Sequence, residues 1–136
     1  MIGLPFPNAQ SAEWRAKLQY VEDVAYRSSA NSDAAEHTPA MTEAQRKTRA
    51  KAAGREFYEN ACMRAVNQSI GRAIRHREDY ATIILIDKRY ASARIQEKLP
   101  GWIKAGSVRV DVAKGGGKFV DVMKACGTFF RTKKTL

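Results

Sequence analysis

The chain has 136 residues and a formal net charge of +10, from 24 Lys and Arg against 14 Asp and Glu. This length allows one domain at most, with a modest core, and the charge favours polyanionic partners such as nucleic acid, nucleotide phosphates or an anionic membrane surface. No apolar run approaches the length needed to cross a bilayer, and the N-terminus lacks the charged start and apolar core of a secretory signal.

The first forty residues predict the end of a strand, then a helix and a loop. Residues 1–8 are apolar, contain two prolines, and predict a strand end that turns into a loop. Ser11 suits the N-cap of a helix that runs to about Tyr26, because apolar residues follow it at helical spacing: Trp14, Leu18, Val21 and Ala25. Residues 27–41 are rich in Ser, Ala and Asn and lack periodicity, so they predict a flexible insertion.

The middle of the chain predicts two basic helices. The first begins near Thr42 and is broken or kinked at Gly54. The second runs from about Arg55 to His76 with one wide apolar face, and cations at its end, His76 and Arg77, offset the helix dipole. The basic run of the first helix is interpreted as a solvated face, with contact to a DNA backbone as the alternative.

A short strand follows. Residues 81–86 are β-branched and almost wholly apolar, which is typical of a strand covered on both faces in a parallel α/β sheet. Asp87 is expected to cap the next turn, and Tyr80 and Trp102 are expected in the core rather than stacked on bases. The remaining prediction is a short helix that ends at residues 100–101, a strand at 108–112, a turn at 115–117, an amphipathic helix at 118–130 and a frayed basic tail.

Two cysteines, Cys62 and Cys126, have no partner at metal-ligand spacing. Cys62 lies on the apolar stripe of the second helix and is interpreted as a small core residue. An iron–sulfur cluster needs about four thiolates, so this chain cannot build one. No metal ligands are therefore assigned.

The strongest functional signal is Q-x-x-G-R-x-x-R at residues 68–75. At about 100° per residue, Gln68, Arg72 and Arg75 share one helical face, opposite the apolar residues. The planar arginine fork meets phosphate oxygens two at a time, and Gly71 lets an anion or another backbone come close. The pattern predicts that this face binds an anion. The alternative is that the two arginines only form a solvated basic face on a surface helix.

This motif resembles motif VI of superfamily 2 helicases, and further blocks agree with it. Residues 65–91 and 98–103 (KLPGWI) resemble the XPD-like iron–sulfur DNA helicases. Residues 3–8 (GLPFPN) and 59–76 (ENACMRAVNQSIGRAIRH) most closely resemble the sister-chromatid-cohesion branch, the chromosome-loss helicases. The resemblance runs from about residue 2 to residue 103.

The resemblance implies an α/β fold, in which residues 1–103 form the C-terminal part of a RecA-like lobe with a parallel sheet and flanking helices, and residues 104–136 a small α/β tail. Arg72 and Arg75 would be catalytic residues at the γ-phosphate of ATP, with Gln68 and Gly71 completing the phosphate contact. The intact protein would be an ATP-dependent 5′–3′ DNA helicase that uses Mg²⁺ and carries a [4Fe–4S] cluster in its first lobe. It would act in the nucleus on single-stranded and forked DNA, with cohesion and replication-fork proteins.

The phosphate-binding loop of such a helicase is missing from this sequence. The nearest candidate to G-x-x-x-x-G-K-[ST] has Val112 in place of the first glycine and Phe119 after Lys118. We therefore expect the C-terminal end of a helicase, inactive by itself. The alternatives are a stand-alone basic module that binds nucleic acid without catalysis, and a non-catalytic truncation that competes with the full helicase.

Overall fold

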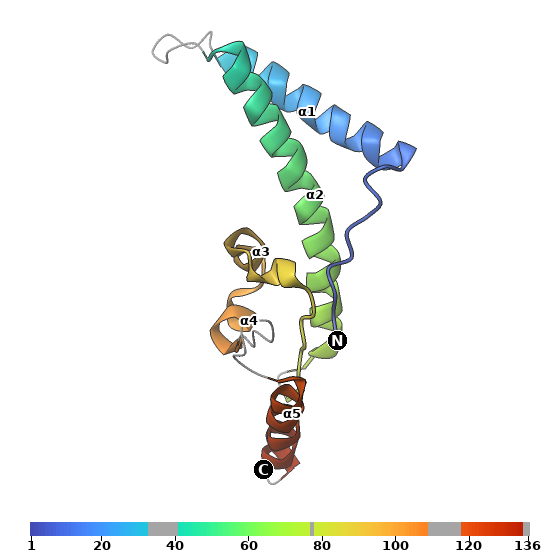
Figure 1. The fold of residues 1–136 in the computed structure, drawn as a ribbon, viewed down its shortest axis with the longest axis vertical. Coiled ribbons are helices and arrows are strands. Elements are labelled where there is room, and N and C mark those ends of the chain that lie inside the picture. The colour runs from blue at the N-terminus through green and yellow to red at the C-terminus, as the bar shows by residue number, and fades with distance from the viewer. Residues whose placement is uncertain (33–40, 77, 109–117, 135–136) are drawn as a thin grey trace.

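The computed structural model describes residues 1–32, 41–76, 78–108 and 118–134. Two long helices, α1 (Ala12–Ser32) and α2 (Glu43–Ala73), pack as arms that meet where α1 ends and α2 begins and then diverge (Figure 1). The short helices η1 (Lys88–Ala91), α3 (Ala93–Glu97) and α4 (Gly101–Gly106) gather beside the C-terminal half of α2. Helix α5 (Phe119–Lys134) lies beyond the end of α2. No helix in these ranges is both long and apolar enough to span a bilayer.

Helix α1 begins as predicted and ends later than predicted. The backbone N–H of Trp14 donates to Ser11 Oγ at 3.3 Å, which confirms the N-cap. The helix continues through Ser32, so residues 27–32 are helical and not part of a flexible insertion. Packing on α2 accounts for this extension, because Ser29 is fully buried and its hydroxyl is satisfied by the Ala25 carbonyl at 2.8 Å. Residues 33–40 lie outside the described residues.

Helix α2 is one continuous helix, and the predicted break at Gly54 is wrong. Its start is held by a capping box, in which Gln45 N donates to Thr42 Oγ1 at 3.3 Å and Thr42 N donates to Gln45 Oε1 at 2.8 Å. Gly54 is buried where α1 passes closely, because a Cβ there would lie 2.6 Å from Glu22 Oε1. The glycine therefore makes room for the packing of α1 on α2.

The predicted parallel sheet is not formed within the described ranges, where no strand is present and one isolated parallel bridge pairs Ile2 with Leu85. Ile2 N donates to the Ile84 carbonyl at 2.8 Å, and Ile86 N donates to the Ile2 carbonyl at 2.9 Å. The segment 81–86 is extended, but a sheet needs adjacent strands along several residues, and the N-terminal segment supplies only this short pairing. The N-terminus consequently lies against the end of α2 (Figure 1).

The core is built on one face of α2. Its fully or almost fully buried members are Cys62, Met63, Val66 and Ile70, covered by Leu4, Tyr90, Ile95, Leu99 and Ile103. The structure confirms Cys62 as a core residue, and burial raises the pKa of its thiol. Both cysteines are free.

Polar contacts fasten the N-terminal segment across this core. Tyr90 Oη donates to the Gly3 carbonyl at 3.1 Å, and Tyr58 Oη donates to the Pro7 carbonyl. Asp87 caps the turn as predicted, because it accepts from Arg89 N at 2.9 Å and pairs with the Arg89 guanidinium at 2.7 Å. These hydrogen bonds lower the pKa of Asp87 to about 2.

Two aromatic residues expected in the core are outside it. Trp102 is 54% exposed, because α4 turns only Ile103 toward the core. Tyr80 is 46% exposed and packs instead on α5, where its ring centroid lies 6.3 Å from that of Phe129 and 6.1 Å from that of Phe130. This contact belongs to the only tail helix described, which runs through Lys134, past the predicted fraying point.

The other predictions for the tail fall largely on residues that the structure does not describe. Val108 is exposed, and residues 109–117 lie outside the described residues. The predicted strand at 108–112 and turn at 115–117 therefore stay predictions. The described part of 104–136 is helical, so a small α/β tail is not shown.

Candidate functional site

The structure places Gln68, Gly71 and Arg72 together on the exposed face of the last turns of α2. The opposite face carries the buried Val66 and Ile70, as the sequence predicted. Arg75 is also exposed, but it lies after the helix, which ends at Ala73. The expectation that Arg75 shares the helical face is therefore wrong.

The turn that carries Arg75 is organised by an aspartate. Ile74, the C-cap residue, is extended at φ −132° and ψ 103°. Asp79 Oδ2 then accepts from the backbone N–H of Arg75 and of His76, at 2.7 Å each. These hydrogen bonds lower the pKa of Asp79, so its carboxylate is ionised at neutral pH. The sequence analysis missed this role, although an Asp that follows a basic segment at a turn is typical of side-chain capping.

The helix-dipole role predicted for the two cations after the motif is also not borne out for His76. His76 lies beyond the helix end, and its Nδ1 accepts from Glu78 N at 3.2 Å. Arg77 lies outside the described residues. The physical reason is that α2 ends at Ala73, where the turn held by Asp79 begins, so His76 is not in the last helical turn.

The helical part of this surface is positively charged and carries no acidic residue. Residues 60–76 contain no Asp or Glu. Across the part of the chain that the structure describes, the Arg72 guanidinium makes no hydrogen bond and no ion pair. An exposed guanidinium without a carboxylate partner is available to an external anion.

Gly71 leaves open space beside Arg72. A Cβ built on Gly71 would meet nothing within 4 Å. Glycine inside a helix costs about 1 kcal/mol relative to alanine. Packing within the described residues does not account for that cost, in contrast to the crowded site at Gly54.

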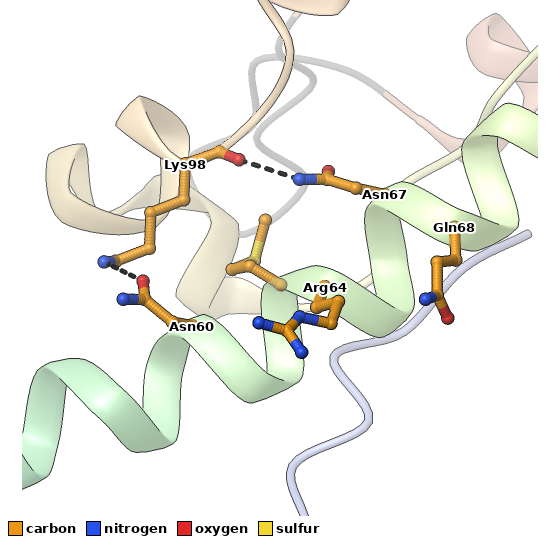
Figure 2. Close-up of a pocket in the computed structure, with 6 residues that line it drawn as sticks. Asn60, Arg64, Asn67, Gln68 and Lys98 are labelled. Atoms are coloured by element: carbon orange, nitrogen blue, oxygen red, sulfur yellow. Dashed lines mark hydrogen bonds between the residues drawn. The ribbon is translucent and has the colours of Figure 1, made fainter.

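A shallow hollow adjoins the motif on the N-terminal side of Gln68. It is lined by α2 residues and by one residue after α3: Asn60, Met63, Arg64, Asn67, Gln68 and Lys98. Figure 2 shows Asn60 and Asn67 reaching toward Lys98, whereas the Arg64 guanidinium and the Gln68 amide do not. Asn67 Nδ2 donates to the Lys98 carbonyl at 3.1 Å, and Lys98 Nζ donates to Asn60 Oδ1.

These contacts join α2 to the segment after α3, and so hold the motif helix against the small helices. Arg64, Gln68 and Arg72 follow one another at four-residue intervals, so they lie along one stripe of α2. The hollow thus continues the positive face of the motif. The arginines of this face can bind an anion. The face carries no pair of residues suited to general acid–base catalysis.

The described residues contain no group of three or more His, Cys, Asp or Glu placed to hold a metal ion. The motif supplies no carboxylate, the side chain by which proteins usually hold Mg²⁺. The residues described here thus do not fit a metal.

Comparison with known proteins gives a family and long relatives. A family model described as the helicase C-terminal domain matches residues 1–106. The chain is 58% identical over 120 residues to a protein named ATP-dependent DNA helicase chl1 from Aspergillus clavatus, covering 88% of this chain and 15% of that protein. Proteins of the same name from Aspergillus niger and Schizosaccharomyces pombe are 50% identical over 135 residues and 46% over 134, covering 99% and 98% of this chain.

The chain therefore spans only 13–15% of the length of these three relatives. No solved structure matches the chain. The relatives extend across the tail as well as the part that the family model covers.

Proposed function

Because this chain belongs to the helicase C-terminal domain family, we propose that it supplies part of the second RecA-like lobe of an ATP-dependent DNA helicase. In this proposal Gln68, Gly71, Arg72 and Arg75 face the phosphates of ATP held by a first lobe. The observation that carries it is the exposed Arg72 guanidinium, which has no partner among the described residues and stands beside the open space at Gly71. The other face of this helix is buried, which fixes the backbone that carries the cation.

The residues fit a phosphate rather than a metal. Hydrolysis of a phosphoanhydride bond of ATP would drive the relative movement of the two lobes. Arg72 and Arg75 stabilise the charge on the γ-phosphate, and an arginine in this role is worth roughly 10³–10⁵ in turnover. Gln68 lies between the phosphates and the lobe interface. Mg²⁺ and a [4Fe–4S] cluster have no ligands on this surface, so both would belong to the first lobe.

The finer assignment extends the same proposal to the whole protein. The relatives are named as DNA helicases, which supports DNA as the partner. The resemblance to the chromosome-loss branch supports 5′–3′ unwinding of forked DNA, action with cohesion and replication-fork proteins, and a nuclear location. Closing and opening of the two lobes around Arg72 and Arg75 would then step the protein along one strand.

The test is Arg72→Ala in the native protein, with ATP turnover measured in the presence of single-stranded DNA. We expect kcat to fall by roughly 10³ or more. The thermal midpoint should change little, because the exposed Arg72 side chain makes no hydrogen bond or ion pair with the described residues. Arg15→Ala is the matched control, since Arg15 is an exposed arginine of α1, distant from the motif. Equal turnover in the two variants would refute the role of Arg72.

The second candidate function is a basic module that binds nucleic acid without catalysis. It is favoured by the exposed cations in the first half of α2: Lys47, Arg49, Lys51 and Arg55. This function predicts strongly salt-dependent DNA binding with no nucleotide effect. The size of the endogenous protein separates the candidates: a band several-fold heavier than 15.2 kDa supports the helicase, and a single band near 15.2 kDa supports the module or a truncated competitor.

A further inference from the structure

We infer that Asp79 is the positioning residue of Arg75. Its carboxylate holds the turn after α2, and the turn sets where the Arg75 guanidinium can reach. This inference rests on the proposed function of Arg75 as a phosphate contact. It adds a residue outside the Q-x-x-G-R-x-x-R pattern to the machinery of the site.

Helix α2 does not hold Arg75. Helix α2 ends at Ala73, and Ile74 is extended, so Arg75 follows a break in the helical hydrogen bonds. Arg72, by contrast, lies in the last helical turn. The two arginines of one motif are therefore positioned by different means.

Asp79 restrains the backbone of Arg75 in place of the helix. One oxygen, Oδ2, accepts from Arg75 N and His76 N at 2.7 Å each, and Asp79 N donates to the His76 carbonyl at 3.0 Å. Hydrogen bonds to a carboxylate are shorter and roughly twice as strong as neutral ones. Two hydrogen bonds to the carboxylate and one backbone hydrogen bond therefore join Asp79 to Arg75 and His76.

The Asp79 carboxylate holds the backbone of Arg75 and attracts its guanidinium only at a distance. No ion pair within 4 Å joins the Arg75 guanidinium to Asp79 or to another described residue. The guanidinium thus stays available for phosphate while its backbone is fixed. A long side chain on an unfixed turn would have to be ordered anew in each cycle, which costs conformational entropy.

The experiment is a double-mutant cycle in the native protein, comparing Asp79→Ala, Arg75→Ala and the double variant. Two quantities are measured: kcat and KM for ATP, and the affinity for ADP with aluminium fluoride, which mimics the transferring phosphoryl group. We expect Asp79→Ala to lower kcat by about 10²-fold, as misplacement of a catalytic group does, with little change in KM. In the Arg75→Ala background the same substitution should have no further effect on kcat or on affinity.

The matched control is Asp121→Ala. Asp121 Oδ2 likewise accepts a backbone N–H, that of Lys118, at 2.9 Å, but at the start of α5. It should change neither kcat nor the affinity for ADP with aluminium fluoride. Asp79→Asn keeps an oxygen acceptor of the same shape, so it should restore part of the loss seen with alanine.

The outcomes separate the two proposals. If Arg75→Ala leaves turnover and fluoride-dependent affinity intact, the proposed function of Arg75 is wrong. If Arg75→Ala impairs both while Asp79→Ala impairs neither, or impairs them equally in both backgrounds, the positioning role is wrong. Should alanine at residue 79 prevent folding, Asp79→Leu, which has a similar size but no oxygen acceptor, takes its place in the same cycle, and unaltered kcat in that variant would overturn the inference.

Discussion

Gly71 and Arg72 are adjacent residues whose surroundings point to a partner outside the described residues. A side chain at Gly71 would meet nothing within 4 Å, and the Arg72 guanidinium reaches no partner in the described ranges. The glycine lowers the stability of the helix, because glycine has a weak helix propensity. The arginine carries a charge that no hydrogen bond or ion pair within the described residues uses. A ligand that approaches this face would account for both.

Gly71→Ala should separate stability from function at this position. We expect the free energy of unfolding to rise by about 1 kcal/mol, because alanine favours the helix and meets no neighbour. The apparent affinity of the native protein for ATP should fall, because the methyl group occupies the approach to Arg72. Gly127→Ala in α5 is the control, since that site is equally open and should gain stability alone. Unchanged ATP affinity in Gly71→Ala would argue against a ligand at this face.

Helix α2 is the element that joins the core to the site. Its inward face carries Met63, Val66 and Ile70, and its outward face carries Gln68 and Arg72. The same helix is crossed by α1 at Gly54, where the absence of a side chain allows close approach. The position of the motif is therefore set by packing along the length of α2.

Met63→Ala should lower the free energy of unfolding by weakening the packing of α2. Met63 is 2% exposed, and truncating a buried methionine costs about 2–5 kcal/mol through lost burial and the cavity that remains. Urea unfolding of the chain measures the change. Met123→Ala is the control, because Met123 is 51% exposed and should change stability by less than about 0.5 kcal/mol. Equal costs for both would mean that the α2 core is not packed as described.

At the scale of the whole molecule, we propose that the chain holds one half of a two-sided site. Its sequence contains arginines that suit a phosphate and no phosphate-binding loop. Its relatives extend far beyond the segment that it matches. The division into residues 1–103 and 104–136 stays a prediction, as does the catalytic role of Arg72 and Arg75.

The 136-residue chain by itself should hydrolyse no ATP, because its sequence lacks a phosphate-binding loop and its described residues offer no metal site. Phosphate release with Mg²⁺ and single-stranded DNA is the measurement. The Arg72→Ala chain serves as the background. DNA-stimulated release above that background would show that the chain is a complete ATPase and would contradict the two-lobe proposal.

Local signals in the sequence were sufficient for several features of the fold. The caps at Ser11 and Asp87 and the buried stripe through Cys62 were predicted and are confirmed, because a cap depends on residues two or three apart and a stripe on helical period. The parallel pairing of residues 81–86 was predicted as part of a sheet and is present as one bridge.

The family could be identified from the sequence alone, because the order and spacing of short sequence blocks can be compared without coordinates. The role of the motif stays a prediction. Tertiary structure decided the rest. Helix α2 continues through Gly54, and α1 continues past Tyr26. Trp102 is exposed, and the motif helix ends before Arg75. Each of these depends on which distant surface packs nearby or on how a turn closes, and those contacts leave no periodic pattern in the sequence.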